Sequence, residues 1–167
     1  MKIAIISDTH DNLINFKKAL SWIKKRKIKT IIHCGDVFKP SVLKRALENF
    51  SGKTHIVFGN TDKDYFSSLE DFKSLPKVKI WTKAGEIETD KRKIAFCHLP
   101  ESAKHLAGSQ KYDIVFYGHS HKPWIEKIGK TKLVNPGNLA GIFYKATFAF
   151  YDTKTGKLEL KILEKLK

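Results

Sequence analysis

Polar side chains that bind metals follow several short apolar runs of this 167-residue chain. The clearest case is the segment FYGHSHKP, where His119 and His121 lie two residues apart just after the apolar run 114–117. Other runs are followed by Asp8, His10, Asp36, Asn60 and His98. Because ligand sites of open α/β sheets form at the carboxyl ends of the strands, we expect these seven side chains to converge.

The chemistry of these seven side chains indicates transition metals. Imidazole nitrogens with carboxylate and amide oxygens differ from the thiolates of structural zinc sites and from the all-oxygen ligands of calcium. Seven donors exceed the needs of one tetrahedral ion but suit two ions that share a carboxylate. Two ions about 3.5–4 Å apart can hold a bridging hydroxide and stabilise in-line displacement at phosphorus. The residue types therefore predict phosphoester hydrolysis with two divalent transition-metal ions.

The elements that must position these donors follow from hydrophobic periodicity. The first part of the chain predicts strands at 3–6, 30–34 and 55–58, separated by helices over 12–27 and 40–50. The rest predicts mostly strands: 78–81, 86–89, 93–97, 114–117, 124–128, 132–134, 147–151 and 158–162, with a short helix or irregular segment at 65–75 and a helix at 101–110. A β-α-β-α-β start followed by mostly β structure favours an α/β domain with two sheets.

Length and composition predict a single domain over residues 1–167. A hydrophobic content of 41% with 29% charged residues is ordinary for a soluble globular chain. No apolar run approaches the roughly 18–20 residues of a membrane helix, and the opening segment lacks the features of a signal peptide. Two cysteines, Cys34 and Cys97, are too few for a disulfide framework. We therefore expect a cytoplasmic protein without a membrane partner.

The charge balance leaves two interpretations open. The chain carries 32 basic and 17 acidic residues, a formal net charge of +15, with a local cluster KKRKIK at 24–29. Such an excess attracts polyanions, so a nucleic-acid surface is one interpretation. The other is a lysine-rich face that is simply solvated.

The order of the motifs resembles that of the calcineurin-like metallophosphoesterases. The motifs are D-x-H, GD, GN-x-D, a later histidine and GHSH, and they begin at Asp8, Gly35, Gly59, His98 and Gly118. The short length and the opening SDTHDN resemble the small bacterial and archaeal phosphodiesterase branch. The resemblance covers residues 3–138.

This resemblance implies a ligand set, a fold and a reaction. One metal ion would take Asp8, His10 and His121, the other Asn60, His98 and His119, and Asp36 would bridge the two. Asn60 and His98 are also the expected catalytic residues. The implied fold is a two-sheet β-sandwich flanked by helices on both outer faces, with four layers α/β/β/α. Manganese is the expected ion, with nickel, cobalt, iron or zinc as alternatives, and the expected reaction is hydrolysis of phosphoesters, above all phosphodiesters.

Two departures and two rival functions accompany the resemblance. Many relatives have a histidine where this chain has Thr61, so protonation of the leaving group has no assigned residue. The fourth motif reads CHLPE rather than a histidine followed by glycine.

The rival functions are a nuclease that uses the basic surface and a non-catalytic scaffold of the same fold. The resemblance also suggests a homodimer. Asn12 and Asp62 are expected to support the site rather than bind metal, and His33 is expected to be structural.

Overall fold

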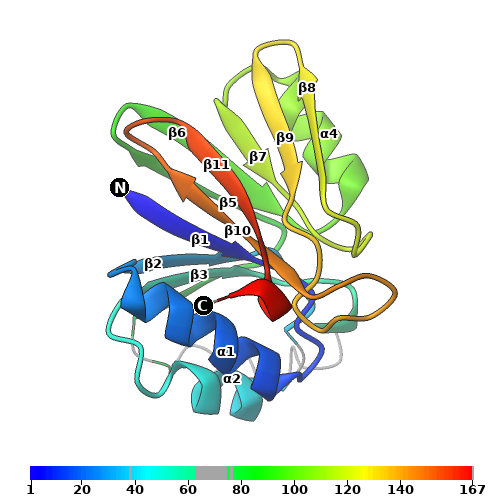
Figure 1. Ribbon diagram of the computed structural model, residues 1–167. Helices are drawn as coiled ribbons and strands as arrows, with labels where there is room; N and C mark the ends of the chain where they lie inside the picture. Colours follow the sequence, from blue (N-terminus) through cyan, green and yellow to red (C-terminus); the bar gives the residue numbers. More distant parts are fainter. Residues whose placement is uncertain (38, 63–74, 76, 167) are drawn as a thin grey trace.

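The computed structural model describes residues 1–37, 39–62, 75 and 77–166. These residues form two sheets that face each other (Figure 1). In spatial order the six-stranded sheet contains β11 (Lys157–Ile162), β10 (Thr147–Asp152), β1 (Lys2–Ile6), β2 (Thr30–His33), β3 (Lys53–Val57) and β4 (Val78–Trp81). The strands β1 to β4 are parallel to one another, so their carboxyl ends lie at the same edge.

The five-stranded sheet also has a parallel centre. Its order is β5 (Ala84–Thr89), β6 (Arg92–Cys97), β7 (Ile114–Phe116), β9 (Thr131–Asn135) and β8 (Trp124–Ile128). The strands β6, β7 and β9 run parallel. Asp90 and Lys91 both have positive φ in the two-residue turn between β5 and β6, a backbone that matches the twist of a hairpin.

Helices cover the outer faces of both sheets. Helices α1 (Leu13–Lys25) and α2 (Pro40–Leu47) lie beneath the six-stranded sheet, while α4 (Pro100–Gly108) covers the five-stranded sheet (Figure 1). The chain ends in a short 3-10 turn, η2 (Leu163–Lys165), which lies beside α1. The predicted α/β/β/α order of layers is therefore confirmed.

Strand alternation explains the layers. In β1, Ile3 and Ile5 face the second sheet, whereas Ala4 and Ile6 pack against α1 and α2. The same alternation recurs in β6, where Ile94 and Phe96 enter the space between the sheets while Ala95 and Cys97 pack against α4. Strands that are buried on both faces read as continuous apolar runs, which is why these runs were conspicuous in the sequence.

The predicted elements agree closely with the structure, with small differences at their ends. Helix α2 ends at Leu47 rather than at residue 50, and β3 begins at Lys53 rather than at residue 55. The predicted segment 65–75 lies almost wholly outside the described residues. Of the C-terminal aromatic residues, Phe148 is fully buried, whereas Phe143 is 90% exposed.

Two observations bear on the expected environment of the chain. Cys34 and Cys97 are free and buried. Within the part of the chain that the structure describes, we find no helix with the length and apolar content needed to cross a membrane.

His33 is a buried polar residue in the layer between β2 and α1. Its Nδ1 accepts a hydrogen bond from the Gly35 amide at 3.3 Å, and its Nε2 lies 3.1 Å from the Thr9 hydroxyl. Burial lowers the pKa of His33 from its ordinary 6.5 to about 3. The imidazole is therefore neutral in the folded chain, which fits the structural role predicted for it.

This depressed pKa predicts a pH dependence of stability. Between pH 6.5 and about 3 the unfolded chain binds a proton at His33 that the folded chain does not. The free energy of unfolding should therefore fall with decreasing pH through this window, by up to about 1.4 kcal/mol per pH unit from this residue. Urea denaturation in the presence of EDTA should show a flatter pH dependence for His33→Gln. The surface variant His105→Gln should keep the parental slope, and an unchanged slope in His33→Gln would contradict the assignment.

Candidate metal centre

The seven predicted donors come together where the two sheets present the carboxyl ends of their strands. Asp8 and His10 follow β1, Asp36 follows β2 and Asn60 follows β3 in one sheet. In the other sheet His98 follows β6, and His119 and His121 follow β7. Asp8, Asp36 and His98 are buried, whereas Asn60 and His119 are exposed. The site therefore has a buried floor and a side that is open to solvent.

One group of donors surrounds Asp8. The Nε2 of His121 lies 3.4 Å from Asp8 Oδ1, and the Nε2 of His10 lies 4.0 Å from the same oxygen. The two imidazole nitrogens are 3.2 Å apart. The Oδ2 of Asp36 lies 3.7 Å from His10 Nε2. All four side chains thus direct a donor atom toward one small volume.

A second group lies on the other side of Asp36. The Oδ1 of Asp36 is 3.4 Å from His98 Nε2. The Oδ1 of Asn60 is 3.0 Å from His98 Nε2 and 2.9 Å from His119 Nδ1. Asp36 therefore presents one oxygen to each group of donors.

The tautomer of His98 tests whether this second group suits a cation. His98 Nδ1 lies 2.8 Å from the carbonyl oxygen of Cys34, which can only accept, so Nδ1 carries the proton. In the neutral ring, Nε2 then holds a lone pair, and it faces the oxygens of Asp36 and Asn60. Three acceptors that face one another repel unless a cation or a proton lies among them. The donor set therefore fits a bound metal ion, and a carbonyl that fixes the tautomer of a ligating histidine is common around metal sites.

The electrostatics around Asp8 also favour cation binding. Burial opposes ionisation of Asp8, but the hydrogen bond with His121 and the nearby His98 outweigh this and lower the pKa of the carboxyl group. The same hydrogen bond raises the pKa of His121, against the opposing effect of its burial. The backbone amide of His119 also donates to the Asp8 carboxylate, at 3.1 Å. Asp8 is therefore held as a carboxylate in a buried position, as a metal ligand must be.

Two glycines make room for these carboxylates. A Cβ atom on Gly118 would overlap the Ser7 hydroxyl and lie 2.7 Å from Asp8 Oδ2, and a Cβ atom on Gly59 would overlap Asp36 Oδ1. The backbone of Gly118 is not left-handed, so this glycine is not needed for a sharp turn. Instead His119 and His121 adopt positive φ, at 70° and 58°. Gly118 is thus required for close approach, and the neighbouring histidines carry the backbone strain.

Residues that sequence reasoning did not connect to the site hold its loops. Asn135 donates to the Gly118 carbonyl at 2.8 Å, and Asn138 donates to the His121 carbonyl at 3.2 Å. Both belong to the segment NPGN at residues 135–138. Its position before the last strand pair gave no sign of these contacts.

The two residues expected to support the site have that role. Asn12 caps α1 by accepting a hydrogen bond from the Asn15 amide at 3.0 Å. Asp62 is buried and accepts from the Gly59 amide at 2.8 Å, which holds the loop that carries Asn60.

Comparison with known proteins gives consistent results. Residues 1–156 match the calcineurin-like phosphoesterase superfamily domain. A phosphodiesterase of Methanocaldococcus jannaschii is 32% identical over 167 residues, which cover 98% of this chain and 100% of that protein. The solved structure of an archaeal phosphodiesterase superposes with a TM-score of 0.87 at 30% identity, covering 97% of this chain and 99% of the other. A phosphoesterase from E. coli shares the fold, with a TM-score of 0.70 at 20% identity over 98% and 100% of the two chains.

Facing sheets with imidazole and carboxylate donors at their strand ends define a metal-dependent phosphoester hydrolase. The match over residues 1–156 and the identity along the whole chain make this assignment specific. The chain belongs to the calcineurin-like phosphoesterase superfamily, whose members use divalent metal ions.

The close approach at Gly118 leads to a prediction about metal affinity. In Gly118→Ala the added methyl group must displace Ser7 or Asp8. We expect about 10- to 100-fold weaker Mn²⁺ binding by isothermal titration, the effect typical of disturbed ligand orientation. Gly108→Ala is the matched control, because a Cβ atom there meets nothing within 4 Å. Equal Mn²⁺ affinity in the two folded variants would contradict the packing argument.

Proposed function

We propose that this chain is a phosphodiesterase that works with two divalent metal ions. The observation that carries the proposal is the position of Asp36, whose two oxygens face two different groups of donors. One ion would be held by Asp8, His10 and His121, and the other by Asn60, His98 and His119, with Asp36 shared. We propose manganese as the preferred ion, with nickel, cobalt, iron and zinc as alternatives.

Bound ions would supply Lewis acidity, which makes hydroxide available near neutral pH and neutralises charge on the phosphoryl oxygens. The chain's own residues prepare the site for this chemistry. The Thr61 amide donates to Asp36 Oδ1 at 3.1 Å and keeps the shared carboxylate oriented. The Cys34 carbonyl fixes His98, as described above. Asn60 and His119 are exposed, so a phosphoester would approach from their side.

A cavity beside the site offers space for one arm of a diester. It has a volume of about 420 Å³, and it borders Asn60 and His98. Lys83, Leu99 and Ser102 also line it. A diester could thus place its phosphorus at the donors and one substituent in this cavity.

Protonation of the leaving group has no assigned residue in this chain. Thr61 stands where many relatives have a histidine, and its amide is already engaged by Asp36. We propose that esters with acidic leaving groups, which depart without a proton donor, are hydrolysed fastest. Asn60 and His98 remain the proposed catalytic residues because they border the cavity as well as the donor set.

We also propose that residues 1–167 work as one domain. The support is that β11, which lies beyond the matched residues 1–156, pairs with β10 and completes the six-stranded sheet. A homodimer remains a prediction, as does a cytoplasmic location, for which the two free cysteines are the support. The convergence of all seven donors speaks against the non-catalytic scaffold.

Loss of a shared or exposed ligand should abolish the reaction. Asp36→Asn removes a charge common to both groups of donors, and His119→Ala removes an exposed donor. We expect each to lower turnover of bis(4-nitrophenyl) phosphate with Mn²⁺ by about 100-fold or more, since even supporting residues cost 10- to 100-fold. Circular dichroism should show folded proteins, and the exposed variant His105→Ala should keep full activity. Unchanged turnover in both variants would place the active site elsewhere.

Metal binding should also stabilise the fold, because the donors come from both sheets. Mn²⁺ at 100 times its dissociation constant should add about 2.7 kcal/mol, which for a chain of this length raises the melting temperature by about 5–10 °C. Differential scanning calorimetry of the EDTA-treated protein with and without Mn²⁺ measures this shift. The Asp36→Asn variant should show a smaller rise. The absence of a shift with Mn²⁺, Ni²⁺, Co²⁺ and Zn²⁺ alike would count against a metal centre.

A further inference from the structure

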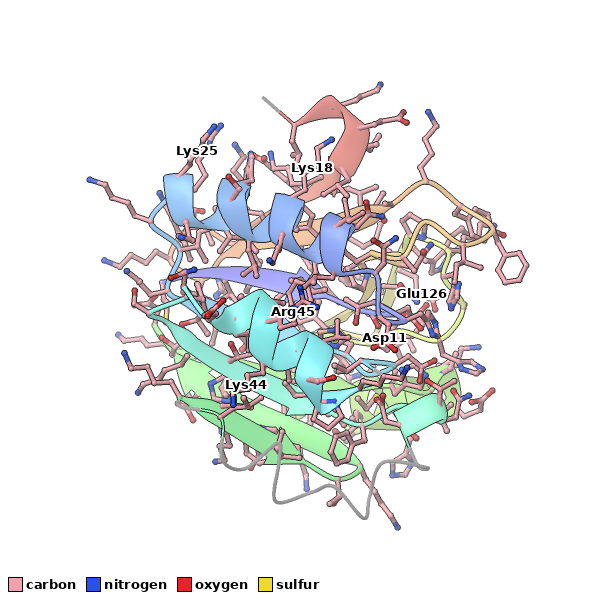
Figure 2. All side chains as sticks on the ribbon, turned by 90° about the horizontal axis from the view of Figure 1, so that it is seen from below. Asp11, Lys18, Lys25, Lys44, Arg45 and Glu126 are labelled. Carbon is pink, nitrogen blue, oxygen red and sulfur yellow. The ribbon has the colours of Figure 1, made fainter. Side chains whose placement is uncertain are left out.

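A basic groove runs between α1 and α2, on the face of the molecule that carries these two helices. The groove has a volume of about 360 Å³. Its lining contains four cations and one acid: Lys17, Lys24, Lys25, Arg45 and Glu48. In Figure 2, which looks onto this face, Arg45 lies between the two helices, while Lys18 and Lys44 lie on the outer flanks. The groove is therefore lined by positively charged side chains, and further lysines lie on the surface around it.

The groove keeps a positive balance, since only one acid, Glu48, lines it beside the four cations. Helix α1 contains no acidic residue along its 13 residues. Lys17, Ser21 and Lys24 follow one another at helical spacing, so they line one side of the groove. Among the residues that the structure describes, none of the four cations of the groove has an ion-pair partner. Their ammonium and guanidinium groups thus remain available to an anionic ligand.

The helix dipole explains only part of this arrangement. Lys24 and Lys25 occupy the last turn of α1, and Arg45 occupies the last turn of α2, where cations interact favourably with the carboxyl-terminal end of a helix. Lys17 lies in the second turn of α1, beyond the reach of this effect, so the dipole gives no reason for a cation there. Its presence on the same side as Lys24 is better explained by a ligand that contacts both.

We propose that this groove binds a single strand of nucleic acid through its sugar-phosphate backbone. A strand presents a row of phosphates, and the groove offers three cations from α1 and one, Arg45, from α2. Three features favour a strand over a bilayer: the surface is concave, its apolar residues Leu20 and Ala46 are buried, and Phe50 is only partly exposed. A bilayer would require exposed apolar side chains beside the lysines.

The groove is separate from the metal centre, although the two helices that line it begin close to the donors in sequence. Helix α1 begins at Leu13, three residues after His10, and α2 begins at Pro40, four residues after Asp36. Lys17 lies about 6 Å along the axis from the start of α1, given a rise of 1.5 Å per residue. A strand in the groove would therefore extend toward the donors at the starts of the two helices. Binding itself needs no metal ion, so it can be tested independently of hydrolysis.

The test measures binding of a fluorescein-labelled 20-nucleotide single strand by fluorescence anisotropy in EDTA, with NaCl varied from 50 to 200 mM, the range over which backbone contacts lose affinity steeply. In the variant Lys17→Gln/Lys24→Gln/Arg45→Gln the slope of log K against log salt should become shallower by about 2, or about 0.7 per lost cation. At 0.1 M salt this corresponds to roughly 100-fold weaker binding. Hydrolysis of bis(4-nitrophenyl) phosphate with Mn²⁺ should be unchanged, because none of the three residues contacts the donors.

The matched control removes the same charge from another face. Lys104→Gln/Lys127→Gln/Lys130→Gln substitutes three exposed lysines on α4 and on the β8–β9 hairpin. This variant should keep the parental affinity and slope. Equal weakening in the two variants would mean that net charge alone attracts the strand, and absence of binding by the parent protein at 50 mM salt would also overturn the proposal. Binding to phosphatidylserine vesicles that depends on the groove, without oligonucleotide binding, would overturn it in favour of a membrane surface.

Discussion

The structure depends on the burial of two carboxylates, Asp8 and Asp36, in a place where other acceptors surround them. Taking a carboxylate out of water is costly unless a cation or several donors compensate it. Backbone amides of His119 and Thr61 supply part of the compensation. The hydrogen bond between Asp8 and His121, which raises the pKa of His121, supplies more. At His98, the Nε2 atom faces the oxygens of Asp36 and Asn60, and a cation or a proton there would complete the compensation. A site of this kind is stable only in combination with a metal ion or a proton. The surrounding strands and loops hold the donors in positions that allow such binding.

The two-sheet architecture meets that requirement by dividing the donors between rigid elements. The ends of β1, β2 and β3 supply the donors of one sheet, and the ends of β6 and β7 supply those of the other. Because parallel strands align their carboxyl ends, no long loop is needed to bring the donors together. The same division makes the centre sensitive to how the sheets pack, so the apolar layer between them contributes to ligand geometry as well as to stability.

Much of this could be predicted from the sequence because the signals are local. Apolar runs marked the strands, and the donors stood directly after them. What could not be predicted depends on atoms that carry no sequence signature. The carbonyl of Cys34 fixes the tautomer of His98, and any residue at that position would offer the same carbonyl. Asn135 reads as part of a turn until the fold places it against the Gly118 carbonyl. The role of Gly118 could not be predicted for the same reason, since the close approach of Ser7 and Asp8 depends on the folded chain.

The contact between Gly59 and Asp36 has an evolutionary consequence. The glycine lacks a side chain because the carboxylate of the preceding motif occupies that space. The two positions are therefore selected as a pair, although 23 residues separate them in the chain. A descendant that exchanged Asp36 for a small residue would release Gly59 from its constraint and could accumulate larger side chains there. In proteins of this fold that have lost catalysis, we expect the glycine at the position of Gly59 to be substituted only after the carboxylate at the position of Asp36 has been lost.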